Sequence, residues 1–208
     1  MRRWPIDAAP AAADLDAIAA LLRDGGVVLL PTDTIYGLHA IATDDAAIER
    51  LVNIKGRTDA KPFVVIGSSI EQLIDIGIDV PLDVQMLLDS LWPAPLTAIL
   101  PLSRRVAASR GASTLAVRVP DLVWLRDLAS RASPLASTSA NRSGEQPISS
   151  PNELAMELQN ALAGIVDRGQ YSGEPSTIVD FTGDEPHLIR EGDHAFTQKV
   201  WKTLRKSL

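Results

Sequence analysis

Cysteine is absent from this sequence of 208 residues, and long apolar runs are absent as well. Without cysteine there is no disulfide framework, no thiolate nucleophile and no cysteine-bound metal. The apolar runs fall far short of the roughly 20 residues that a membrane-spanning helix needs. The start, Met-Arg-Arg-Trp-Pro, is not followed by the apolar segment of a signal peptide. These absences favour a cytoplasmic protein without membrane association.

Several motifs of common enzymes are also missing. The sequence contains neither the G-x-x-x-x-G-K-S/T phosphate loop nor the G-x-G-x-x-G dinucleotide fingerprint, and no G-x-S-x-G nucleophile elbow. Its three histidines, His39, His187 and His194, lie far apart and show no metal-ligand spacing. The sequence therefore predicts no metal site. It indicates chemistry by positioning and charge stabilisation rather than by a covalent protein nucleophile.

Positive charge is scarce overall but concentrated in one stretch. The 26 acidic and 20 basic residues give a net charge of −6, which disfavours avid attraction to nucleic acid. Residues 101–144 nevertheless hold seven arginines against two aspartates. Such a surplus suits small anionic ligands, although any one of these arginines is equally well explained as a solvated surface residue. The seven are Arg104, Arg105, Arg110, Arg118, Arg126, Arg131 and Arg142.

Helices and strands alternate along the chain, with no repeat and no composition break, so one domain covering residues 1–208 is expected. This mixture predicts an α/β protein in which helices cover a sheet and ligand loops lie at the strand ends. Apolar spacing predicts helices near 15–24, 44–53, 82–91, 150–161 and 196–204. Apolar runs predict strands at 27–30, 38–42, 63–66, 97–100, 114–119, 135–137, 164–167, 178–181 and 188–190.

Three polar segments lie beside predicted strands, where the ligand loops of α/β proteins are found. They are PTDTIYGL at 31–38, KGRTDAKP at 55–62 and STSANRSG at 137–144. Each has an ordinary structural explanation, as a capped turn, as cations at a helix C-terminus or as a polar loop. In the second segment, glycine and proline favour a loop that directs Lys55 and Arg57 at an oligophosphate. The short groups of the third suit a base edge or a zwitterion.

Taken in order, the motifs resemble those of one known family. PTDTIYGL, KGR followed by KP, WPAPLT, LAVRVP, STSANRSG, PSTIVD and IREG are similar to the motif series of the YrdC-like threonylcarbamoyl-AMP synthases, over residues 26–192. The resemblance implies a YrdC/RibB-like fold, a twisted open mixed sheet with helices packed on it and a large basic cavity. Two departures are that Ala94 replaces a glycine of many members, and Ile66 stands near a histidine of some members.

The resemblance also implies roles for individual residues. The family's K-x-R and S-x-N pairs, both associated with catalysis, match Lys55, Arg57, Ser139 and Asn141. The positions implied to bind L-threonine are Thr32, Tyr36, Arg118, Ser139 and Ser176, with Arg118 as the partner of its carboxylate. The positions implied to bind ATP are Arg57, Lys61, Thr114, Asn141, Ser149 and Arg190.

The implied activity is that of a nucleotidyltransferase, which joins L-threonine, bicarbonate and ATP into threonylcarbamoyl-AMP and pyrophosphate. The product is the precursor of a threonylcarbamoyl modification of the adenosine next to the tRNA anticodon. Mg²⁺ is expected on the ATP phosphates, with no organic cofactor. A downstream threonylcarbamoyl-transferase complex is the expected partner, and contact with tRNA is expected to be weak or indirect.

Two alternatives remain open. The chain could be an RNA-binding module without its own catalysis, which the net charge of −6 and the 4% aromatic content disfavour. It could also keep the fold and perform carbamoyl-adenylate chemistry with another acceptor. A salt titration of tRNA binding would identify the first alternative.

Overall fold

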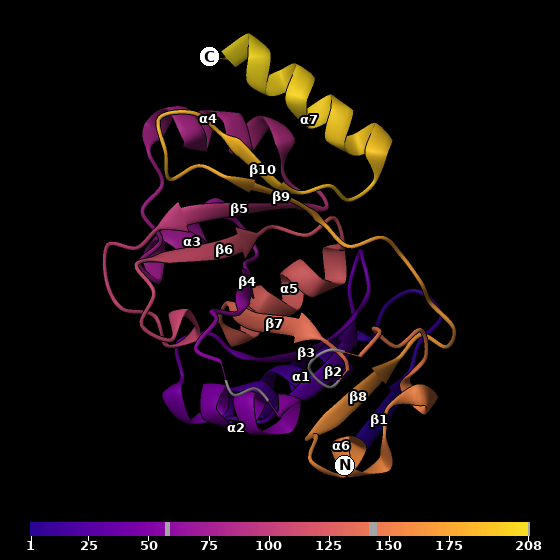
Figure 1. Cartoon of the computed structure of the whole chain (residues 1–208). Coiled ribbons are helices and arrows are strands. Elements are labelled where there is room, and N and C mark those ends of the chain that lie inside the picture. The colour runs from indigo at the N-terminus through magenta and orange to yellow at the C-terminus, as the bar shows by residue number, and fades with distance from the viewer. Residues whose placement is uncertain (57–58, 142–144, 208) are drawn as a thin grey trace.

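A computed structural model describes residues 1–56, 59–141 and 145–207, and its strands join one twisted sheet (Figure 1). The strand order in the described residues is β1-β8-β2-β3-β7-β4-β6-β5-β9-β10, with parallel and antiparallel neighbours mixed. This confirms the α/β prediction. The strands are β1 (Arg2–Pro5), β2 (Val28–Pro31), β3 (Tyr36–Ile41), β4 (Val64–Ile66), β5 (Leu96–Pro101), β6 (Thr114–Arg118), β7 (Leu135–Ser139), β8 (Gly164–Asp167), β9 (Thr177–Asp180) and β10 (His187–Arg190).

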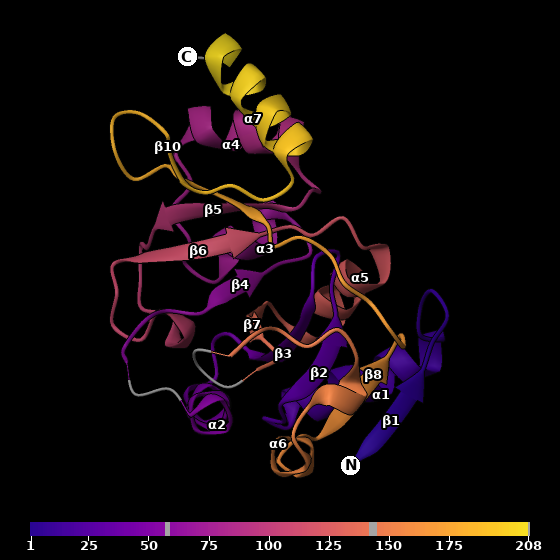
Figure 2. The ribbon, with the colours of Figure 1, turned by 45° about the vertical axis from the view of Figure 1, so that its right-hand side comes forward.

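The helices lie on both faces of this sheet, and α7 packs beside α4 at the end of the molecule opposite the N-terminus (Figures 1 and 2). No helix in the described part of the chain combines the length and the apolar character that a membrane span requires. The α-helices are α1 (Ala12–Arg23), α2 (Asp45–Lys55), α3 (Ile70–Asp75), α4 (Leu82–Leu91), α5 (Val123–Ala132), α6 (Met156–Asn160) and α7 (His194–Ser207), and two short 3-10 turns are η1 (Ala107–Ser109) and η2 (Pro151–Glu153).

The two faces of the sheet are covered unequally. One face packs in a large core against α2, α3, α4, α6 and α7, and the other packs in a smaller core against α1 and α5. On β7, Ala136 belongs to the large core and Leu135 to the small one. Because side chains alternate along a strand, Ser137 and Ser139 share the face of Leu135. These serines lie beyond the area that α1 and α5 cover.

Hydroxyl groups build the turn between β2 and β3. Pro31 pairs with Tyr36, so residues 32–35 alone make the turn. Thr32 Oγ1 accepts hydrogen bonds from the backbone N–H groups of Thr34 at 3.1 Å and Ile35 at 3.2 Å, which is the usual way a threonine closes a turn. β3 therefore begins two residues before the predicted strand, and Tyr36 lies on a strand rather than in a loop.

The ends of α2 are set by its capping residues. Asp44 Oδ1 accepts hydrogen bonds from the N–H groups of Ala46 at 2.9 Å and Ala47 at 3.1 Å. At the other end Gly56 has a φ of 63°, the left-handed conformation that closes helices and that glycine adopts without strain. Lys55 is therefore the last helical residue, with a buried side chain, and not a loop residue.

The predicted helix at 150–161 is wrong as one continuous element. Ser150 accepts a hydrogen bond from the Asn152 N–H at 3.4 Å, but the Glu153 carboxylate turns back to the N–H of Ser149 at 3.0 Å rather than to Ser150. The reciprocal capping pattern that continues a helix is thus shifted by one residue. The chain makes the short turn η2, extends at Leu154 and starts again as α6.

Three further elements, β1, α3 and α5, are missing from the sequence prediction. β1 is an edge strand whose only buried side chain is Trp4, so it has no apolar alternation. α3 has six residues, fewer than two helical turns. α5 could have been found, because Trp124, Leu125 and Leu128 recur at helical spacing and are all buried.

Candidate functional site

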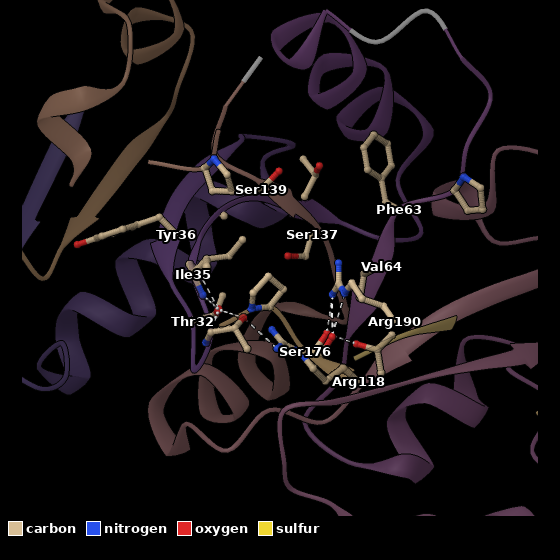
Figure 3. Close-up of a pocket in the computed structure, with 17 residues that line it drawn as sticks. Thr32, Ile35, Tyr36, Phe63, Val64, Arg118, Ser137, Ser139, Ser176 and Arg190 are labelled. Carbon is tan, nitrogen blue, oxygen red and sulfur yellow. Dashed lines mark hydrogen bonds between the residues drawn. The ribbon is translucent and has the colours of Figure 1, made fainter. Parts of the chain in front are cut away.

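A cavity of about 300 Å³ lies on the sheet face that α1 and α5 leave uncovered. Its lining comes from the β2–β3 turn, β4, β6, β7 and the segments around β9 and β10, which are far apart in the sequence (Figure 3). The cavity brings together six of the predicted site residues: Thr32, Tyr36, Arg118, Ser139, Ser176 and Arg190.

Arg118 is the most deeply buried cation of this cavity, with 4% of its surface exposed. Its Nη1 donates a hydrogen bond to Thr34 Oγ1 at 3.1 Å and lies 3.2 Å from Asp33 Oδ1. Within the described residues, its Nε is buried without a hydrogen-bond partner. Burial lowers the pKa of Arg118, and the Asp33 carboxylate opposes this effect. A guanidinium with an unused N–H beside a cavity is suited to bind a carboxylate.

Arg190 supplies a second guanidinium from the edge strand β10. Its Nε and Nη2 donate to the Ser176 carbonyl oxygen at 3.1 and 2.9 Å, and Ser176 Oγ lies 2.8 Å from Thr97 Oγ1. Burial lowers the pKa of Arg190, and the charge of Arg118 lowers it further. The two cations, which both line the cavity, therefore repel each other. An anionic ligand between them would relieve this repulsion.

The segment between β8 and β9 crosses directly over the β2–β3 turn. A Cβ atom placed on Gly173 would lie 2.1 Å from the Thr34 carbonyl oxygen, and one on Gly192 would lie 2.4 Å from the Pro175 carbonyl oxygen. Only glycine allows backbones to approach so closely. Gly173 thus brings the segment before β9 against the β2–β3 turn, and Thr32 and Ser176 both line the cavity.

Tyr36 lines the cavity with its body rather than with its hydroxyl group. The hydroxyl donates to the Gly169 carbonyl oxygen at 3.0 Å and accepts from the Arg168 N–H at 2.8 Å. Figure 3 shows it pointing away from Arg118 and Ser176. Burial raises the pKa of Tyr36, which keeps the hydroxyl protonated. The ring of Tyr36, and not its hydroxyl group, is therefore the part that can contact a ligand.

Lys55, Ser139 and Asn141 come together at the end of β7, as the sequence predicts for a common site. Lys55 Nζ donates to the Ser139 carbonyl oxygen at 2.7 Å and to Asn141 Oδ1 at 2.6 Å, and it lies 3.2 Å from Ser139 Oγ. Ser139 lines the cavity, whereas Lys55 and Asn141 lie behind it. Lys55 therefore does not line the cavity itself, but it contacts Ser139, which does.

Of the predicted ATP positions that the structure describes, Arg190 lines the cavity, whereas Asn141, Lys61, Thr114 and Ser149 do not. Lys61 is exposed, although its neighbour Pro62 lines the cavity, and Thr114 begins β6 at the far end from Arg118. Ser149 Oγ donates to Glu153 Oε1 at 2.6 Å. Arg57 lies outside the described residues. The ATP roles of these residues stay predictions.

The arginines of the stretch 101–144 do not all lie at the cavity. Of the six arginines of this stretch that the structure describes, Arg118 alone lines the cavity. Arg126 donates to the Pro120 carbonyl oxygen at 2.6 Å, and Arg131 pairs with Asp16 at 2.6 Å. Arg142 lies outside the described residues. The second cavity cation, Arg190, comes from outside the stretch.

Thr34, Thr97 and Ser137 line the cavity but are not among the individually predicted site residues. Ser137 stands within the quoted STSANRSG segment, two residues before Ser139. Alternation along β7 was the signal that could have placed both serines on one face. Thr34 is found only through its contact with Arg118, 84 residues away.

Ile66, the departure noted in the sequence, is buried in the small core with α1 and α5. It lies outside the cavity lining, whereas Val64 of the same strand contributes to it. Ala94, the other departure, is buried in the large core. Neither substitution changes the polar groups of the cavity.

His39 lies beside the cavity, fully buried on β3. Its Nδ1 is 2.9 Å from the Gly37 carbonyl oxygen, and its Nε2 is 3.1 Å from Ser137 Oγ. Burial lowers the pKa of His39 to about 3, against the opposing effect of the Gly37 and Val28 backbones. The imidazole is thus neutral at physiological pH.

This buried histidine predicts a pH-dependent stability. Below the ordinary histidine pKa of 6.5, the unfolded chain binds a proton at His39 that the folded chain does not bind. Stability is therefore lost as the pH falls, by about 2 kcal/mol between pH 7 and pH 5 from this residue. Urea unfolding at both pH values should show a smaller loss for His39→Phe than for the unsubstituted chain. Equal losses would contradict the burial of a neutral His39.

A family model, Sua5_yciO_yrdC, described as Telomere recombination, matches residues 20–192. The threonylcarbamoyl-AMP synthase of Pyrococcus abyssi is 36% identical over 84% of this chain and 52% of that relative. The threonylcarbamoyl-AMP synthase of Bacillus subtilis is 36% identical over 92% of this chain and 58% of that relative. The chain thus spans little more than half the length of these two relatives.

The structure is also similar to solved structures. A crystal structure of P. abyssi Sua5 complexed with L-threonine superposes with a TM-score of 0.87 at 32% identity, covering 96% of this chain and 61% of that one. Both the sequence and the fold therefore agree with the motif resemblance. The chain belongs to the Sua5_yciO_yrdC family.

Proposed function

We propose that this protein is a threonylcarbamoyl-AMP synthase, a nucleotidyltransferase that makes threonylcarbamoyl-AMP and pyrophosphate from L-threonine, bicarbonate and ATP. The names of its relatives and the threonine complex of P. abyssi Sua5 support this proposal. We further propose a cytoplasmic location. A threonylcarbamoyl-transferase complex would receive the product.

The observation that carries the proposal is the buried Arg118 beside the cavity, whose Nε has no hydrogen-bond partner among the described residues. Such a group fits the carboxylate of an amino acid through charge-assisted hydrogen bonds. Arg190 lines the same cavity, and the charge of Arg118 lowers the pKa of Arg190. Small hydroxyl groups from Thr32, Ser139 and Ser176 supply the short donors and acceptors that orient a zwitterion.

The proposed reaction has two steps. Bicarbonate loses hydroxide to form carbon dioxide, and the neutral amine of threonine attacks its carbon. The proton that leaves the amine combines with the hydroxide as water, and a carbamate remains. A carbamate oxygen then attacks the α-phosphorus of ATP, the bond from that phosphorus to the bridging oxygen breaks, and pyrophosphate leaves. All of the charged intermediates are anions, so the task of the protein is to align them and to neutralise their charge. Arg118, Arg190 and the Lys55–Ser139 pair are placed to do so.

Mg²⁺ enters this proposal as part of the substrate MgATP. In the part of the chain that the structure describes, no three or more His, Asp or Glu side chains form a group that could hold a metal. The ion would therefore be held mainly by the phosphates, as is common for Mg²⁺.

Pyrophosphate release tests the proposal. Purified protein with MgATP and bicarbonate should release pyrophosphate when L-threonine is present, and at least tenfold less when threonine or bicarbonate is left out. Alanine and glutamate serve as control amino acids. Release that does not depend on threonine would point to another acceptor. Absence of release, with tight and steeply salt-dependent tRNA binding, would favour the RNA-binding module instead.

A further inference from the structure

The side chains of His39 and Ser137 contact each other at 3.1 Å, and Ser137 lines the cavity. Both residues lie on neighbouring strands in direct register, β3 and β7. A Cβ atom on Gly37 would lie 2.8 Å from His39 Cε1, so the imidazole occupies space that only a glycine leaves open. Ser137, whose Oγ lies 3.1 Å from His39 Nε2, lines the cavity and is labelled in Figure 3.

The neighbours of the ring fix its tautomer. The Gly37 carbonyl oxygen can only accept a hydrogen bond, so His39 Nδ1 at 2.9 Å carries the hydrogen. A neutral imidazole then has a lone pair on Nε2, and Ser137 Oγ at 3.1 Å must donate to it. The single hydroxyl hydrogen of Ser137 is thus directed at His39. Only the oxygen lone pairs of Ser137 remain for the cavity.

An acceptor at this point complements the cations of the cavity. Arg118 and Arg190 are donors and select anionic groups of a ligand. A hydroxyl free to rotate could donate to an anion as readily as it accepts, but Ser137 held by His39 can only accept. Threonine offers both features at once, a carboxylate and, on the adjacent Cα and Cβ atoms, an N–H donor and an O–H donor.

We propose that His39 is a positioning residue that holds the Ser137 hydroxyl as a hydrogen-bond acceptor for an N–H or O–H group of the amino-acid substrate. This inference rests on the proposed synthase function and adds a determinant of substrate choice to it. His39 acts only through Ser137. The effects of substituting the two residues therefore cannot be independent.

Steady-state pyrophosphate release with Ser137→Ala, His39→Phe and the double variant tests the inference. Loss of one neutral hydrogen bond should raise the KM for threonine about three- to tenfold in Ser137→Ala and in His39→Phe, with kcat and the KM for ATP unchanged. The double variant should be no worse than Ser137→Ala. Ser68→Ala is the matched control, because it removes a half-buried serine hydroxyl that donates to Gln72 Oε1 at 2.9 Å away from the cavity.

Valine in place of threonine identifies the donor. If the threonine hydroxyl is the donor, Ser137→Ala will reduce the preference for threonine over valine. If the amine nitrogen is the donor, Ser137→Ala will weaken the use of both amino acids equally. A change in the KM for ATP alone, or additive effects in the double variant, would overturn the inference.

A measurement on the unsubstituted chain covers the case in which His39→Phe does not fold. Nitrogen NMR of ¹⁵N-histidine-labelled protein should show His39 as the neutral Nδ1–H tautomer, with an Nε2 resonance that shifts in Ser137→Ala. A hydrogen on Nε2 would overturn the inference, whatever the catalytic result. Absence of threonine-dependent pyrophosphate release would instead remove the proposed function, while this tautomer would still be observed.

Discussion

Arg118→Gln should raise the KM for L-threonine about ten- to hundredfold, because charge-assisted hydrogen bonds to a carboxylate are worth roughly 1.5–3 kcal/mol. Glutamine keeps the volume and one donor but removes the positive charge that is buried beside the cavity. The KM for ATP should change little. The measurement is pyrophosphate release at varied threonine and saturating MgATP.

Arg118 has an ion-pair partner, Asp33, and the chain offers a matched arginine, Arg126, for a control variant. Arg118→Gln leaves the Asp33 carboxylate, 3.2 Å from Arg118 Nη1, without its cation, so stability should be compared with that of Arg118→Gln/Asp33→Asn. Arg126→Gln is the matched control, since Arg126 donates to the Pro120 carbonyl oxygen outside the cavity. An unchanged threonine KM in folded Arg118→Gln protein would remove Arg118 from carboxylate binding.

Lys55→Met should lower kcat about a hundredfold and reduce the free energy of unfolding by roughly 1–3 kcal/mol. The buried ammonium donates to the Ser139 carbonyl oxygen and to Asn141 Oδ1, and methionine can replace only its apolar stem. The loss of stability arises because the Asn141 oxygen is left without this donor. Kinetic assays and urea unfolding of the same preparation measure both effects.

The comparison for this variant is Lys202→Met, which removes an exposed lysine on α7 and should leave both quantities unchanged. A Lys55→Met protein with full kcat but reduced stability would assign Lys55 to structure alone. A loss of stability is expected here because Lys55 ends α2 and is buried, and does not lie in the predicted loop.

Elements with strong local signals were predicted well. α4 was predicted at 82–91, as observed, because apolar residues at helical spacing stop before Pro93. β8 was also predicted at its observed bounds. The helix at 150–161 failed because its capping contacts depend on which N–H the Glu153 carboxylate reaches, which spacing alone does not decide. β1 failed because an edge strand with one buried residue carries no pattern.

The candidate site was predicted where its residues stand in a recognisable motif series. The structure brings Thr32, Arg118, Ser176 and Arg190 to one cavity, although no local rule connects the β2–β3 turn to β6 and β10. The direction of the Tyr36 hydroxyl could not be predicted, because its partners lie at 168 and 169. The hydrogen-bond partner of His39 Nε2 could not be predicted either, because Ser137 lies 98 residues away in the sequence.

The central claim is that this cavity joins threonine, bicarbonate and the adenylyl group of ATP. The most direct test is mass spectrometry of the product formed from ¹³C-bicarbonate, L-threonine and MgATP. The account predicts an adenylate that contains threonine and one ¹³C atom, and predicts its strong reduction in Arg118→Gln at low threonine concentration. Pyrophosphate release that yields an adenylate without the ¹³C label, or without threonine, would contradict the account.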